Sequence, residues 1–104
     1  MHKDDFRIDQ EKHEQGVRYI LRGKLNSTSA ANLEQALNKS LAKGDINISL
    51  NMLRVSYLSS TGIRVLLKSY KEAFAAGGKL RIEGPSENVR NVLGMTALDK
   101  LLMD

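Results

Sequence analysis

Residues 50–67 read LNMLRVSYLSSTGIRVLL and predict a strand that passes through a short loop into a helix. Ser59, Ser60 and Thr61 place hydroxyl groups where this helix is expected to begin. The first N–H groups of a helix lack an intrahelical partner, and a hydroxyl oxygen can accept a hydrogen bond from them. The start of a helix also carries about half a positive elementary charge, so it would stabilise a phosphate attached to one of these side chains.

The chemistry of this hydroxyl cluster leaves two interpretations open. Serine and threonine are ordinary helix caps, so the cluster could do no more than start the helix. The other interpretation is a phosphorylation site at the positive end of the helix. Gly62 leaves a similar choice, because a residue without a side chain either fits the packing of the first turn or allows a partner to approach closely.

The patterns on either side of this stretch predict an α/β fold. The expected elements, in chain order, are strands at 6–8 and 17–21, a helix from 27–29 to 41, a strand at 46–50, a helix from 59–61 to 74, a strand at 79–83, a helix from 86 to 93 and a short helix at 98–103. The turn expected over 12–16 makes the first two strands antiparallel. Strands that alternate with helices predict a mostly parallel four-stranded sheet with about four helices.

The same patterns predict which residues are buried around the central loop. Met52, Leu53 and Val55 follow the strand at 46–50 and are expected beneath the loop as core. The helix after the loop has apolar residues at helical spacing, and its expected buried face is Ile63, Leu66, Leu67, Tyr70 and Phe74.

The loop that contains Asn26 and Ser27 is expected beside the loop at 59–61. Both loops follow strands and precede helices, with Ser27, Thr28 or Ser29 as the expected cap of the first helix. In a parallel strand–helix arrangement such loops lie at the same edge of the sheet. We therefore expect the two loops to share one surface.

Length and composition narrow the class of protein. A chain of 104 residues is expected to form one domain, 1–104, without a linker. The absence of cysteine excludes disulfide frameworks, thiol catalysis and cysteine metal sites. No apolar run approaches the roughly 20 residues of a membrane span, and the N-terminus lacks the apolar core of a signal peptide. We expect a cytoplasmic protein that does not enter a membrane.

The formal charge of +4 does not by itself indicate a nucleic-acid partner. Lysines and arginines are scattered among acids, and five aromatic residues offer no stacking platform. A mildly basic surface is equally expected to be solvated or to match an acidic protein partner.

No catalytic or cofactor motif is recognised in the chain. His2 and His13 have no partner at metal-ligand spacing, and no histidine is expected in a loop beside Ser60. Gly-x-Ser-x-Gly, a glycine-rich nucleotide motif and an acidic metal cluster are all absent from the sequence. We therefore expect no enzyme activity and no cofactor.

Three segments resemble the STAS family, the bacterial anti-sigma factor antagonists. YLSSTGI at 57–63, followed by an apolar helix, resembles the family's signature loop. GKLN at 23–26 with the Ala/Leu-rich segment behind it, and the segment that begins with GPS at 84–86, resemble two further family segments in the same order. The resemblance covers nearly the whole chain.

The resemblance implies a phosphorylation switch. Aligned with the family, Ser60 is the serine that a partner anti-sigma factor with kinase activity phosphorylates, and a serine phosphatase would reverse the change. The unmodified protein would bind the anti-sigma factor and free a sigma factor for transcription. The implied partner-binding residues are Asn26, Ser27, Ser59, Ser60, Thr61, Gly62 and Arg64.

The chain departs from the family pattern at two positions near Ser60. Asn26 and Ser59 stand where the family usually carries acids that help in kinase recognition. These neutral residues favour a second hypothesis, in which the module is not phosphorylated. It would then serve as a scaffold or small-ligand-binding subunit of a larger complex such as a transporter.

Overall fold

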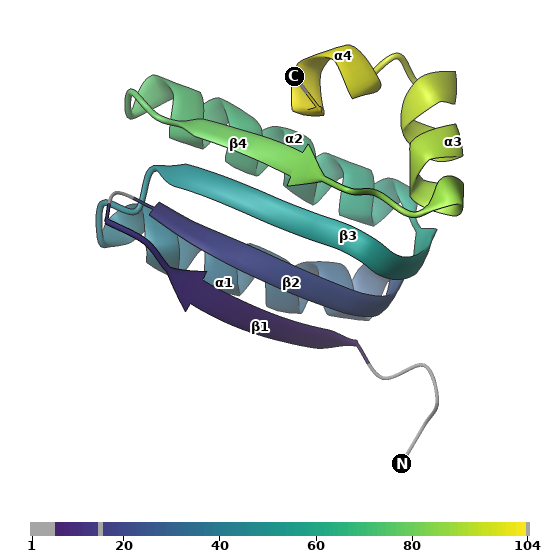
Figure 1. The fold of residues 1–104 in the computed structure, drawn as a ribbon, viewed down its shortest axis with the longest axis horizontal. Coiled ribbons are helices and arrows are strands. Elements are labelled where there is room, and N and C mark those ends of the chain that lie inside the picture. Colours follow the sequence, from purple (N-terminus) through teal and green to yellow (C-terminus); the bar gives the residue numbers. More distant parts are fainter. Residues whose placement is uncertain (1–5, 15, 104) are drawn as a thin grey trace.

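The computed structural model describes residues 6–14 and 16–103, which form one mixed sheet with the strand order β1-β2-β3-β4 (Figure 1). In chain order the elements are β1 (Arg7–Lys12), β2 (Gly16–Leu25), α1 (Ser27–Ala42), β3 (Asn47–Leu58), α2 (Ser60–Ala75), β4 (Lys79–Glu83), α3 (Glu87–Met95) and α4 (Asp99–Leu102). β1 pairs antiparallel with β2, whereas the pairs β2–β3 and β3–β4 are parallel. The predicted α/β fold is confirmed.

One face of the sheet is covered by α1 and α2, which lie side by side behind it in Figure 1. Val17, Tyr19 and Leu21 of β2 are buried on this face, because side chains alternate between the two faces of a strand. α3 packs against β3 and α4 against β4, beyond the β4 edge. The opposite face of the sheet therefore has no helix across it in Figure 1.

A buried tyrosine ties the sheet to α1. The Tyr19 hydroxyl donates to the Ala36 carbonyl oxygen at 2.8 Å and lies 2.5 Å from Ser40 Oγ. Burial raises the pKa of Tyr19, an effect that the Ser40 hydrogen bond opposes and the nearby charge of Asp45 reinforces. Tyr19 therefore stays neutral and fixes the position of α1 over β2.

The turn between β1 and β2 joins the two strands where the sequence predicts it. Lys12 ends β1 and Gly16 begins β2, and the His13 N–H donates to the Gly16 carbonyl oxygen at 2.8 Å. His13 is exposed on this turn. Gln15 of the turn and His2 lie outside the described residues.

β2 and β3 run several residues further than predicted. Register shifts in the β2–β3 pairing set extra residues of β3 against β2, and such bulges interrupt the alternation of side chains. Met52, Val55 and Leu58 are consequently buried at a spacing of three. The prediction that Leu53 is core is wrong, because this irregular stretch leaves its side chain 60% exposed.

The predicted buried face of α2 is also partly wrong. Leu66 is buried as expected, whereas Phe74 is 70% exposed and its ring stacks on Tyr70, with centroids 6.4 Å apart. The buried positions of α2 are Gly62, Val65, Leu66, Ser69 and Ala73. These buried residues include small ones, which bring α2 close to the sheet. The buried face is therefore less apolar than the predicted one, which contained Tyr70 and Phe74.

Candidate functional site

The candidate site is the edge of the sheet where β2 and β3 end and α1 and α2 begin. Leu25 and Leu58, the last residues of the two strands, are partners in register. The Ser59 N–H donates to the Leu25 carbonyl oxygen at 2.9 Å, which joins the two strand ends directly. The predicted proximity of the two loops is therefore confirmed. We call the five residues there, Asn26, Ser27, Ser59, Ser60 and Thr61, the capping edge.

Asn26 is the cap of α1. Its side-chain oxygen accepts from the Ser29 N–H at 3.0 Å, and its own N–H donates to Ser29 Oγ at 2.8 Å. The two bonds form a capping box, in which the cap and the third helical residue each bind the other's backbone. The prediction that Ser27, Thr28 or Ser29 caps the helix is wrong. Asn26, the residue before Ser27, is the cap, because its side chain accepts from the free Ser29 N–H in the first turn.

Ser59 is the cap of α2. Its hydroxyl oxygen accepts from the Gly62 N–H at 3.0 Å. Thr61 Oγ1 instead lies 3.3 Å from Ser27 Oγ, which links the starts of the two helices. Only one of the three hydroxyls at 59–61 therefore accepts from the first turn, although each was predicted to be able to do so.

Ser60 is the hydroxyl that remains available. It is the first residue of α2, it is exposed, and its side chain makes no hydrogen bond within residues 6–14 and 16–103. No acidic residue lies in the first turn of α1 or of α2. A phosphate on Ser60 would therefore lie at a positive helix start without a carboxylate in that turn to repel it.

Gly62 lies beneath the capping edge. A Cβ added to it would be 3.0 Å from Leu25 Cγ, Leu25 Cδ2 and Leu58 Cδ1. The residue is buried, and its missing side chain lets α2 begin directly against the two strand ends. Arg64 lies two residues further along α2 and has an exposed side chain.

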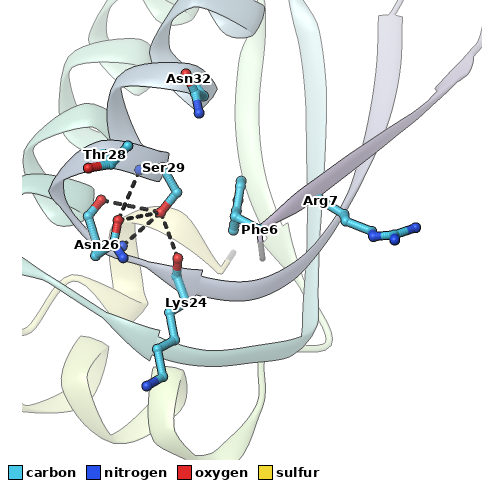
Figure 2. Close-up of a pocket in the computed structure, with 7 residues that line it drawn as sticks. All are labelled: Phe6, Arg7, Lys24, Asn26, Thr28, Ser29 and Asn32. Carbon is cyan, nitrogen blue, oxygen red and sulfur yellow. Dashed lines mark hydrogen bonds between the residues drawn. The ribbon is translucent and has the colours of Figure 1, made fainter. Parts of the chain in front are cut away.

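A pocket of about 410 Å³ lies beside the capping edge and is lined by residues that include Phe6, Arg7, Lys24 and Asn26. Figure 2 shows the Ser29 hydroxyl within hydrogen-bonding distance of Asn26 and of the Lys24 carbonyl oxygen, the latter at 2.6 Å. The charged ends of Arg7 and Lys24 point away from this hydrogen-bonded group. The capping network thus supports the edge, and the basic groups do not converge on it.

Two residues that contribute to the architecture of this end were not recognised in the sequence. The Ser86 hydroxyl, at the start of α3, donates to the Val55 carbonyl oxygen at 2.5 Å, and the Asn88 side chain donates to the Ser56 carbonyl oxygen at 3.0 Å. These bonds hold the part of β3 that extends beyond β4. Ser86 also caps α3, since its Oγ accepts from the Val89 N–H at 3.3 Å. Nothing in its spacing indicates the additional bond to a strand so distant in sequence.

The family is established by comparison with known proteins. The STAS domain model matches residues 7–103. The chain belongs to the STAS domain family. Within the part of the chain that the structure describes, no helix is long and apolar enough to cross a bilayer, and no cluster of three or more His, Cys, Asp or Glu could hold a metal.

Two individual proteins are similar in sequence to this chain over more than two thirds of its length. The anti-sigma-B factor antagonist of Bacillus subtilis is 26% identical over 98 residues, which cover 94% of this chain and 89% of that protein. BtrV of Bordetella bronchiseptica is 35% identical over 72 residues, or 69% of this chain and 62% of BtrV.

The fold is also that of the Bacillus anti-sigma factor antagonist SpoIIAA. Its unphosphorylated form matches with a TM-score of 0.83 and 24% identity, covering 94% of this chain and 87% of SpoIIAA. Its phosphorylated form matches with a TM-score of 0.76 and 23% identity, covering 94% and 90%.

Proposed function

We propose that this protein is an anti-sigma factor antagonist that binds an anti-sigma factor through the capping edge and so frees a sigma factor for transcription. Ser60 acts as the switch, and its phosphorylation by the anti-sigma factor, acting as a serine kinase, ends the interaction. The observation that carries the proposal is the state of the three neighbouring hydroxyls. The hydroxyls of Ser59 and Thr61 take part in hydrogen bonds within the fold, whereas the Ser60 hydroxyl is exposed and forms no hydrogen bond within the described residues.

The geometry of Ser60 suits an acceptor of phosphate. In the transfer, Ser60 Oγ forms a bond to the γ-phosphorus of ATP, the bond to ADP breaks, and the serine proton passes to a base of the kinase. No hydrogen bond within residues 6–14 and 16–103 has to break to free the Ser60 hydroxyl. Among residues 6–14 and 16–103, no carboxylate or imidazole forms a hydrogen bond with Ser60. We propose that the protein acts by binding and not by catalysis.

Phosphorylation would change the charge of this surface without unfolding it. The side chains of the capping edge are all uncharged, and a phosphate adds about −1.5 to −2 charges among them. In the free protein the helix start and water stabilise that charge. In a complex the phosphate would be buried against the partner without a counter-charge, which is strongly unfavourable.

The relatives support this proposal in two ways. The Bacillus subtilis relative is an antagonist of the anti-sigma-B factor, and SpoIIAA exists in an unphosphorylated and a phosphorylated form with the same fold as this chain. A serine phosphatase is the second partner that the switch requires. Because the proposed partner controls transcription, we propose that the complex forms in the cytoplasm.

The neutral residues Asn26 and Ser59 bear on the alternative of an unphosphorylated scaffold or ligand-binding subunit. Both are helix caps here, and Asp, Asn and Ser serve that purpose about equally well. Their replacement of acids therefore preserves the fold of the edge. The replacement removes negative charge beside Ser60. The alternative hypothesis predicts that a kinase no longer recognises Ser60. Our proposal predicts that the kinase still recognises Ser60 through the shape of the capping edge and the positive start of α2.

The experiment combines the purified protein with the kinase-type anti-sigma factor encoded nearest to its gene and ATP, and maps phosphate by mass spectrometry. We expect one phosphate, on Ser60, and none on Ser60→Ala. Ser60→Ala should bind the anti-sigma factor with ATP present as well as absent. Phosphate on Ser59 or Thr61 alone, or no phosphate with intact binding, would overturn the switch.

Asn38→Asp is the matched control for Ser60→Asp in the same binding assay. Asn38 is exposed on α1, eleven residues beyond Ser27 and hence about 16 Å along the helix axis from the capping edge. Both variants add one negative charge. We expect Ser60→Asp to abolish binding and Asn38→Asp to leave it unchanged, whereas equal losses would show that the net charge of the protein, and not the position of the charge, decides.

A further inference from the structure

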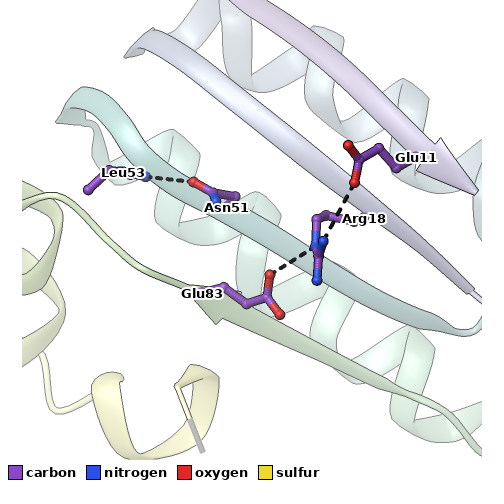
Figure 3. Close-up of polar contacts among 5 residues, drawn as sticks. All are labelled: Glu11, Arg18, Asn51, Leu53 and Glu83. Atoms are coloured by element: carbon purple, nitrogen blue, oxygen red, sulfur yellow. Dashed lines mark hydrogen bonds and ion pairs between the residues drawn. The ribbon is translucent and has the colours of Figure 1, made fainter.

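The uncovered face of the sheet carries its charged side chains in rows that run across the strands. One row, from β1 to β4, is Glu11, Arg18, Ser49 and Arg81, and the next is Asp9, Ile20, Asn51 and Glu83. Figure 3 shows the Arg18 guanidinium between two carboxylates, 3.5 Å from Glu11 and 3.2 Å from Glu83. This half of the face therefore balances much of its own charge.

The third row is made of arginine alone. Arg7 of β1 lies opposite Arg22 of β2, which lies opposite Arg54 of β3. All three side chains are exposed, and none forms an ion pair or side-chain hydrogen bond within the described ranges 6–14 and 16–103. We call these residues the arginine row.

The arginine row is unfavourable for the isolated sheet. Neighbouring strands are about 5 Å apart, and like charges directly opposite one another destabilise a sheet. Ile8 and Leu21, the neighbouring pair in register, point to the helix-covered face, so Arg7 and Arg22 point to the open one. Arg54 is the register partner of Arg22 and is exposed, whereas the next residue, Val55, is buried. No side chain among the described residues offsets this repulsion, so an acidic partner bound at the row would relieve it.

Apolar side chains adjoin the arginine row. Leu53 precedes Arg54 and is 60% exposed, and Tyr57 is 50% exposed opposite Lys24 in the register. Exposed apolar surface beside arginine is characteristic of protein interfaces, in which aromatic residues and arginine are enriched. The surface therefore combines positive charge with apolar contact area.

We propose that the arginine row, with Leu53 and Tyr57, docks a segment of a partner polypeptide that carries both acidic and apolar residues. A second copy of this chain is a poor occupant, because its own arginine row would face the first. A nucleic acid is also a poor occupant, because the arginine row is only one residue wide along each strand and is followed on β1 by Asp9, which repels phosphates. Ser60 is not part of this surface, so the proposal does not depend on phosphorylation.

The test uses a short fluorescein-labelled peptide in which glutamate and leucine alternate, with binding measured by fluorescence anisotropy. Arg22→Gln removes the central arginine, and Arg81→Gln is the matched control, because Arg81 is an exposed arginine on the same face but outside the row. We expect Arg22→Gln to weaken binding roughly tenfold, the usual effect of losing a hydrogen-bonded charge pair. Arg81→Gln should change it little.

Three further measurements test this docking surface, and the first two separate it from general attraction between opposite charges. A peptide with glutamine in place of glutamate should lose most of its affinity, and single-stranded DNA of equal charge should bind more weakly than the acidic peptide. Arg22→Gln should also unfold at equal or higher urea concentration than the unmodified protein, because like-charge repulsion is relieved. Equal losses from Arg22→Gln and Arg81→Gln, or DNA binding as tight as the peptide, would overturn the proposal.

Discussion

Gly62→Ala tests whether the capping edge is held together by direct packing of α2 on the strand ends. The new Cβ would lie 3.0 Å from three side-chain carbons of Leu25 and Leu58, which is closer than ordinary van der Waals contact. Forcing an extra carbon into a packed site typically costs about 1–3 kcal/mol. The gain in helix propensity is at most about 1 kcal/mol. We expect a net loss of about 1 kcal/mol in the free energy of unfolding.

Gly94→Ala in α3 is the matched control for this prediction. Gly94 is exposed, and nothing lies within 4 Å of the Cβ it would acquire, so only the propensity gain applies. Urea denaturation should therefore show opposite signs, with Gly94→Ala stabilised by up to about 1 kcal/mol. If Gly62→Ala were stabilised as much as Gly94→Ala, α2 would have room above Leu25. That result would contradict the tight packing of α2 on the ends of β2 and β3.

Three other substitutions test the caps and the core. Asn26→Ala should lower the free energy of unfolding by about 1 kcal/mol through loss of the cap to Ser29, whereas Asn26→Asp should keep it, as measured by urea denaturation. Tyr19→Phe should lower the free energy of unfolding at pH 7 by about 1 kcal/mol, because the hydroxyl hydrogen bond is lost. Burial raises the pKa of Tyr19, so the folded protein keeps a proton that the unfolded chain loses near about pH 10. Urea denaturation at a series of pH values should therefore show the difference between the two proteins shrinking above about pH 10. Ser69 is buried with no partner for its hydroxyl oxygen among the described residues, so Ser69→Ala should raise the thermal unfolding midpoint, with a gain of about 1 kcal/mol, and a lower midpoint would contradict this.

The sequence predicted those features that rest on regular local patterns. Strict alternation at 46–50 and 79–83 and the helical spacing from Ala30 to Leu41 located elements that the structure contains. The strand–helix order then placed the ends of β2 and β3 at one edge, because crossover connections make the strands parallel. The proximity of Asn26 and Ser59 followed from topology alone.

The features that were missed depend on tertiary contacts. The bulges in the β2–β3 pairing put Met52, Val55 and Leu58 on one face at a spacing that no strand pattern predicts, and they expose Leu53. The buried face of α2 includes Gly62 and Ser69, whose low hydrophobicity conceals them in the sequence. Phe74 belongs to a more apolar stripe that lies outside the packed face.

The arginine row could not be recognised either, because its members are separated by many residues and meet only through the register. Arg22 and Arg54 become opposite one another only after a register shift in the β2–β3 pairing. Scattered positive charge in the sequence was therefore compatible with a solvated surface as well as with an acidic partner. The structure brings these arginines together on one face.

The binding affinity of the anti-sigma factor for the unmodified and the fully Ser60-phosphorylated protein tests the central claim most directly. Isothermal titration calorimetry with both forms, each confirmed as folded by circular dichroism, gives the two dissociation constants. An uncompensated buried charge costs about 3–5 kcal/mol, so the phosphorylated form should bind at least about 100-fold more weakly. Equal affinities for the two forms would contradict the proposal that a phosphate on Ser60 switches off binding at the capping edge.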